Sequence, residues 1–166
     1  MTTKEDFRAF GYDTPEFSLL GTKCYARCVN VYDGDSPTIV IPLGAKMYKF
    51  HTRLFGIDTS EMHSKDPVNK TRAVRGRNRL IELITKAGNN GGASVVTKKD
   101  IKDLLGADVY LVWVECMEMD KYGRILLKMY SAENDTKSFS DILLEEKLAY
   151  SYMGQTKLTE AQQAGM

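Results

Sequence analysis

Two apolar runs joined by a short turn place the strongest constraint on how this chain of 166 residues can fold. Residues 108–119 (DVYLVWVECMEM) and 125–130 (ILLKMY) are dominated by aliphatic and aromatic side chains, which favour strands. The connection begins with Asp120 and carries Gly123 at its fourth position, which is the pattern of a type I turn. The two runs are therefore expected to pair as a β-hairpin.

Three further strands are expected in the N-terminal half of the chain. Residues 18–32 have a β-favouring composition. A proline lies on each side of residues 38–41, so this short strand is expected at the edge of a sheet. Apolar and polar residues alternate over 48–54, which places Arg53 on the face turned away from the core.

Helical patterns occupy the middle and the end of the chain. Residues 67–87 carry an apolar stripe at helical spacing, and the glycines and asparagines of 88–92 end this helix. A capping-box pattern at 97–100 begins a short second helix. A final amphipathic helix is expected after Ser138 or Ser140, followed by a short, weak helix in the tail.

Together these elements predict an α+β fold that is mainly β, namely a five-stranded OB-like barrel with two or three helices. The length fits a single domain spanning residues 1–166. The polar residues 1–16 are expected to form an N-terminal arm outside the core.

The overall charge of +1 gives no global argument for binding nucleic acid, so any such argument must be local. Residues 65–86 contain seven basic and two acidic side chains. Arg72, Arg75 and Arg79 are expected on one face of the helix, at spacings of three and four residues. This face either follows a nucleic acid backbone or is simply a solvated helix surface.

The three cysteines are odd in number and include no CxxC pair, which argues against a disulfide framework and a zinc site. No signal peptide is visible, and no apolar run is long enough to cross a bilayer. The protein is therefore expected to be cytoplasmic or otherwise intracellular, without membrane association and without an obligate protein partner.

Three short motifs supply the residue types that phosphodiester hydrolysis requires. They are Val31–Ser36 (VYDGDS), Arg53–Glu61 (RLFGIDTSE) and Asp120–Arg124 (DKYGR). Their carboxylates can bind a hard cation or activate a water molecule, and their two guanidiniums can neutralise charge on a phosphorane. Each motif alone has a simpler interpretation, since DGDS can be a plain turn and DKYGR a plain hairpin loop. Coincidence is improbable for all three in this order.

In combination, the motifs resemble those of the staphylococcal nuclease (thermonuclease) family over roughly residues 20–155. The resemblance implies that Asp35, Asp58 and the carbonyl of Thr59 bind one Ca²⁺ ion. It implies that Asp33 is a nearby supporting acid. The remaining implied roles are a water-activating carboxylate at Glu61, a phosphate-gripping pair at Arg53 and Arg124, and substrate contacts at Lys121, Tyr122, Tyr150 and Tyr152.

The chain departs from the family pattern in three places, one of which is a C-terminal helix that is shorter than usual. Ser60 stands where the family commonly has proline after the Asp-Thr pair. Residues 88–106 are expected to be an insertion between the first helix and the following strand. His51 and His63 form no HxxxH or HNH pattern and are expected at the surface.

These expectations favour a Ca²⁺-dependent nuclease that cleaves DNA and RNA with little sequence specificity and a preference for single strands. The alternative is a catalytically inactive OB-like module that binds nucleic acid or protein. An inactive copy should have lost one of the five residues that the resemblance places at the metal, water and phosphate, and all five are present.

Overall fold

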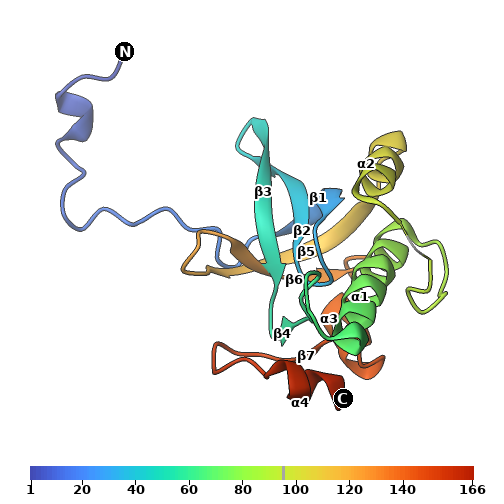
Figure 1. Cartoon of the computed structure of the whole chain (residues 1–166). Coiled ribbons are helices and arrows are strands. Elements are labelled where there is room, and N and C mark those ends of the chain that lie inside the picture. The colour runs from blue at the N-terminus through green and yellow to red at the C-terminus, as the bar shows by residue number, and fades with distance from the viewer. Residues whose placement is uncertain (95) are drawn as a thin grey trace.

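The computed structural model describes residues 1–94 and 96–166, and its core is a closed five-stranded barrel (Figure 1). The strands are β1 (Lys23–Val31), β2 (Pro37–Leu43), β3 (Lys46–Leu54), β5 (Leu111–Met119) and β6 (Ile125–Tyr130). They follow one another around the barrel in the order β1–β2–β3–β6–β5. Only the β3–β6 pairing is parallel among these five. The predicted mainly β, OB-like barrel is confirmed.

The predicted hairpin of β5 and β6 is confirmed, and the side chains on its inward face fill the interior of the barrel. The amide of Gly123 donates to the carbonyl of Asp120 at 3.1 Å, which closes the turn between the two strands. Alternate side chains of both strands point inward and are fully buried. They are Val112, Val114, Cys116, Ile125, Leu127 and Met129.

The prediction that residues 38–41 form an edge strand is wrong. Strand β2 pairs with β1 on one side and with β3 on the other, because a closed barrel leaves no free edge there. Pro37 is the first residue of the strand, and Pro42 lies near the β2–β3 turn, opposite Met47. The prolines therefore stand at the ends of a paired strand, where the missing N–H is tolerated.

Within the described residues, four α-helices accompany the barrel. They are α1 (Pro67–Thr85), α2 (Lys98–Ala107), α3 (Phe139–Glu145) and α4 (Glu160–Ala164). Capping boxes begin the last three, at Thr97, Ser138 and Thr159, so Ser138 rather than Ser140 caps α3. A small second sheet pairs β4 (Ile57–Asp58) with β7 (Tyr150–Ser151). Across the described ranges, no helix combines the length and apolar character that crossing a membrane requires.

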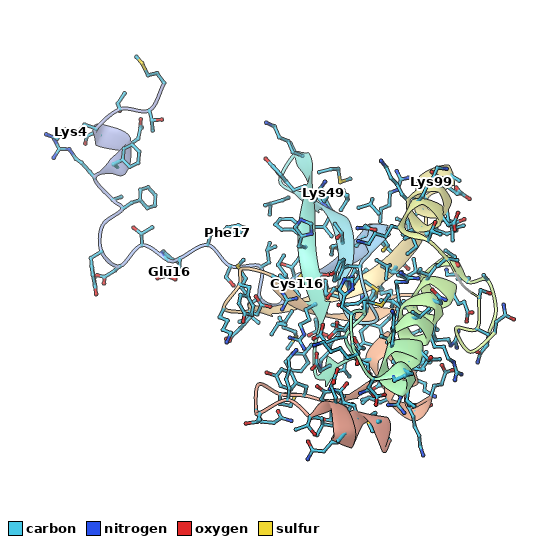
Figure 2. All side chains as sticks on the ribbon, in the orientation of Figure 1. Lys4, Glu16, Phe17, Lys49, Lys99 and Cys116 are labelled. Atoms are coloured by element: carbon cyan, nitrogen blue, oxygen red, sulfur yellow. The ribbon has the colours of Figure 1, made fainter. Side chains whose placement is uncertain are left out.

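Two segments lie outside the barrel. Residues 1–18 are exposed, contain one 3₁₀ turn, η1 (Glu5–Phe7), and extend away from the strands (Figure 1). Figure 2 shows Lys4, Glu16 and Phe17 along this arm. The segment expected to be an insertion, 88–106, contains most of α2, which packs against β1 through Ile101 and Leu105.

The arginines of α1 do not form the expected basic face, because each guanidinium is used in a different structural contact. Buried Arg79 pairs with Glu146 at 2.8 Å and with Glu82 at 3.3 Å. Arg72 donates to the carbonyl of Gln163, and exposed Arg75 donates to a loop carbonyl at 3.1 Å. The helix therefore uses its positive charge mainly to fix neighbouring segments.

Arg79→Ala should lower the free energy of unfolding by roughly 3 kcal/mol, since it leaves two largely buried carboxylates without their partner. Arg75→Ala removes an exposed arginine from the same helix and should change stability by less than about 0.5 kcal/mol. Urea denaturation of both variants measures the difference. Equal midpoints for the two variants would contradict the structural role of Arg79.

Candidate functional site

The turn between β1 and β2 is built so that it presents Asp35 to the end of β3. Asp33 accepts the amide of Asp35 at 3.1 Å, and Tyr32 donates its amide to the carbonyl of Ser36 at 3.2 Å. The amide of Leu54 then donates to the carbonyl of Asp35 at 2.8 Å. These bonds fix the turn and tie it directly to the strand that carries Arg53.

Gly34 allows this turn to approach its neighbours closely. A Cβ atom at this position would lie 3.0 Å from Cγ2 of Thr59 and 3.2 Å from the carbonyl carbon of Gly76 in α1. Backbone at that distance cannot move aside cheaply, so the position favours glycine for reasons of space. The glycine of the DGDS motif thus seats Asp33 and Asp35 against α1.

Arg53 lies between the two predicted metal-binding carboxylates. Its Nε is 3.3 Å from Oδ2 of Asp35, and its Nη2 is 2.6 Å from Oδ1 of Asp58. The arginine side chain is only 11% exposed, and the two aspartates are more buried still. Three residues from two motifs therefore meet in one cluster, and Arg53, expected on the face turned away from the core, is largely buried between the two carboxylates.

Asp35 is incompletely satisfied by these contacts. Ser36 donates to its Oδ1 at 3.2 Å. Its buried Oδ2 accepts no hydrogen bond from any described residue, because the approach of Arg53 is an ion-pair contact without hydrogen-bond geometry. Burial, and then the neighbouring charge of Asp33, raises the pKa of Asp35 well above its ordinary value near 3.8. The cluster holds more negative charge than Arg53 neutralises.

Asp58 is held from the opposite side by the C-terminal part of the chain. In the small sheet Asp58 pairs with Tyr150, whose hydroxyl donates to Oδ2 of Asp58. Burial, and then this hydrogen bond, raises the pKa of Tyr150. Tyr150 is 8% exposed and supports the carboxylate from behind, while its expected contact with substrate stays a prediction.

The predicted metal, water and phosphate residues all border one hollow of about 420 Å³, which we call the cleft. They are Asp35, Arg53, Asp58, Thr59, Glu61 and Arg124. Thr59 and the neighbouring Ser60 are buried, whereas the Glu61 side chain is 72% exposed at the rim. Glu61 is therefore the carboxylate of this set that is most open to water.

Arg124 reaches the cleft from the β5–β6 turn and is braced by Asp120. The Nε of Arg124 lies 2.7 Å from Oδ2 of Asp120. Oδ1 of Asp120 accepts the amides of Tyr122 and Arg124, each at 2.9 Å. Burial acts to raise the pKa of Asp120, but the hydrogen bonds from Arg124 and Tyr122 outweigh it and lower that pKa. The brace uses Nε and does not use the terminal guanidinium nitrogens.

A second hollow of about 600 Å³, which we call the side pocket, adjoins the cleft and shares Arg53, Arg124 and Lys157 with it. It contains three of the four predicted substrate-binding residues: Lys121, Tyr122 and Tyr152. The guanidinium carbon of Arg53 lies 5.1 Å from the centre of the Tyr152 ring, and that of Arg124 lies 5.6 Å from the Tyr122 ring. Arg53 and Arg124 thus each have an aromatic neighbour in the side pocket.

Lys157 belongs to the site, although no sequence motif predicted it. Its Nζ lies 3.2 Å from Oδ2 of Asp58 and 3.8 Å from Oε1 of Glu61. The tail that carries it is anchored through Glu160, which accepts from Ser64 at 2.6 Å and from Asn69 at 2.8 Å. No local pattern surrounds Lys157, so only the tertiary path of the tail reveals it.

The carboxylate and carbonyl oxygens of the expected metal site are of the type that a hard cation binds. The described residues contain no cluster of three or more His, Cys, Asp or Glu side chains suited to a metal. The expected set has only two carboxylates and one backbone carbonyl, so water and substrate oxygens would have to complete the coordination. The unsatisfied Oδ2 of Asp35 provides an oxygen that a cation would neutralise.

Comparison with family models and with curated proteins identifies no relative for this chain. No model of a known protein family matches it, and no curated protein is significantly similar to it. Any functional assignment therefore depends on the geometry of the cleft and on the motif resemblance.

Asp35→Asn should raise the thermal stability of the protein in the presence of a chelator, because it removes a buried charge that is incompletely compensated. A gain of about 1 kcal/mol corresponds to roughly 2–4 °C in Tm for a chain of this size. Well below pH 3.8 the carboxyl is protonated in both the folded and the unfolded chain, so the variants should approach each other there. The advantage of asparagine should grow as pH rises through the raised folded pKa.

Calorimetry of both proteins between pH 4 and 8 measures this difference, with Asp13→Asn in the exposed arm as the control. A variant that is less stable than the wild type at neutral pH would show that Asp35 is fully compensated.

Proposed function

We propose that this protein is a Ca²⁺-dependent phosphodiesterase that hydrolyses DNA and RNA with little sequence specificity. The observation that carries the proposal is the composition of the cleft. It brings together a buried carboxylate pair, two guanidiniums from separate motifs and one exposed carboxylate. An ordinary structural ion pair does not require the second arginine or the exposed acid.

Asp35, Asp58 and the carbonyl of Thr59 are the groups that would hold the ion. Oxygen donors of this kind, completed by water, suit the large and flexible shell of Ca²⁺ better than the octahedral shell of Mg²⁺. When bound there, Ca²⁺ supplies positive charge beside a phosphate oxygen. It would also relieve the excess negative charge around Asp35.

The chain's own residues supply the remaining functions. Glu61, open to solvent at the rim, can orient a water molecule and accept its proton. Arg53 contacts the aspartates through Nε and Nη2, so its third nitrogen is free of those contacts and can donate to a phosphate oxygen. Arg124 can offer its terminal nitrogens while Asp120 holds its Nε.

The side pocket supports a preference for unpaired nucleotides. Tyr122 is 72% exposed, and Lys121 lies beside its ring at 5.2 Å. Aromatic faces accept any base by stacking, and lysine contacts phosphate without reading sequence. From the motif resemblance, the products are expected to carry 3′-phosphate and 5′-hydroxyl ends.

Digestion of labelled single-stranded DNA, duplex DNA and RNA tests the proposal directly. We expect cleavage in Ca²⁺, little cleavage in Mg²⁺ and none in chelator, with single strands cut fastest. End-group analysis of the products should give 3′-phosphates. Binding of oligonucleotides without cleavage in Ca²⁺ would instead support the inactive OB-like binding module.

Glu61→Gln should lower kcat by about 10²–10⁴-fold, the usual value of general-base assistance. Because Glu61 is exposed and contributes little to packing, binding of a non-cleaved oligonucleotide and thermal stability should both stay near wild type. Steady-state cleavage assays measure the effect on kcat, and fluorescence anisotropy measures the effect on oligonucleotide binding. A variant with a near-normal kcat would remove Glu61 from the mechanism.

Arg124→Lys should lower kcat by roughly 10²-fold, because lysine keeps the charge but cannot pair with Asp120 and present a two-nitrogen edge at once. Arg75→Lys makes the same exchange at an exposed site on α1 and should leave kcat unchanged. Steady-state kinetics on a single-stranded substrate compares them. Equal rates for both variants would contradict a bidentate contact from Arg124.

A further inference from the structure

A third hollow, which we call the α2 groove, runs between α2 and the barrel and has a volume of about 580 Å³. Strands β1, β2 and β3 form one wall, and the helix forms the other. Its basic lining residues are Lys49, Lys98, Lys102 and His51, and no Asp or Glu of the described chain lines it. Figure 2 shows Lys49 on the barrel wall and labels Lys99 on the helix.

The charged residues of α2 are spaced so that two of its lysines face the groove. Lys98 and Lys102 are four residues apart and therefore lie on the same side of the helix, next to buried Ile101. Lys99 points elsewhere and pairs with Asp103 at 2.8 Å, while Asp100 is used in the capping box with Thr97. Neither groove lysine of α2 forms an ion pair within the described chain.

The α2 groove is continuous with the cleft. Four residues line both: Asn30, Tyr32, Thr38 and His51. Tyr32 is 53% exposed at this junction, and Nζ of Lys98 lies 5.9 Å from its ring centre. An exposed aromatic ring next to several unpaired cations is the combination that holds single-stranded nucleic acid, by stacking a base and neutralising adjacent phosphates.

We propose that the α2 groove binds the part of a single-stranded nucleic acid that extends beyond the scissile phosphate. Tyr32 stacks on a base at the mouth of the groove, and Lys49, Lys98 and Lys102 contact successive phosphates. This proposal rests on the proposed function, because the cleft supplies the point from which the strand extends. The segment 88–106 thereby lengthens the substrate site instead of only covering β1.

The test compares two double variants that remove the same charge. Lys98→Ala/Lys102→Ala empties the α2 wall of the groove, and Lys4→Ala/Lys99→Ala removes two exposed lysines outside it. Binding of fluorescent single-stranded DNA of three and twelve nucleotides is measured in chelator by anisotropy across a range of salt concentrations. Urea denaturation verifies that both variants remain folded.

For the groove variant we expect the Kd for the twelve-nucleotide strand to rise about tenfold, with the three-nucleotide strand unaffected. The salt slope should fall by roughly 0.7 for each phosphate that a lysine no longer neutralises. The control double variant should match wild type with both strands. Equal effects from the two variants, or equally weakened binding of both strand lengths, would overturn the proposal.

Failure of the groove and failure of the proposed function give different results. Cleavage in Ca²⁺ with an unaltered twelve-nucleotide Kd would reject the α2 groove and leave the nuclease proposal standing. The groove variant could instead bind only the twelve-nucleotide strand more weakly while the protein cleaves no substrate. That result would reject the proposed nuclease activity and support the α2 groove as a binding site.

Discussion

The guanidinium of Arg53, placed between Asp35 and Asp58, is the interaction on which the rest of the site depends. It joins the β1–β2 turn, the end of β3 and the small β4–β7 sheet through one buried side chain. Its positive charge faces two carboxylates; Lys157 also approaches Asp58, whereas Oδ2 of Asp35 accepts no hydrogen bond from the described residues. Burial raises the pKa of Asp35, so any charge on this carboxylate is costly unless a partner compensates it.

Segments far apart in the sequence complete this cluster, and most of them serve it indirectly. Tyr150 supports Asp58 from β7, Lys157 reaches it from the tail, and Asp120 orients Arg124 from the β5–β6 turn. The C-terminal segment stays in place because Glu160 bonds to the beginning of α1. Positioning of the reactive groups is therefore distributed over the whole barrel and its covering helices.

The sequence predicted well those features that depend on short patterns. Apolar composition and the turn between them predicted β5 and β6, and the three motifs predicted residues that the fold brings to one cleft, among them Asp35, Asp58 and Arg124. Prediction from the sequence failed where tertiary contacts determine the position of a residue. Nothing local shows that Arg79 is buried against Glu146, since a surface arginine has the same spacing. The two prolines led to the wrong prediction that β2 is an edge strand, because the sequence of a single strand does not show whether the barrel closes. Lys157 and the α2 groove need the complete fold.

The parallel pairing between β3 and β6, which we call the seam, holds the barrel together less extensively than the neighbouring antiparallel pairing. It contains three paired positions, Thr52 with Ile125, Arg53 with Leu126 and Leu54 with Leu127, whereas β2 and β3 pair at six. Arg53 lies within this seam, and Arg124 immediately precedes it. Local opening there would part the two guanidiniums while both flanking hairpins stay intact, so the amides of the seam should exchange with solvent before those of the hairpins. Arg53 and Arg124 would then separate before the protein unfolds globally.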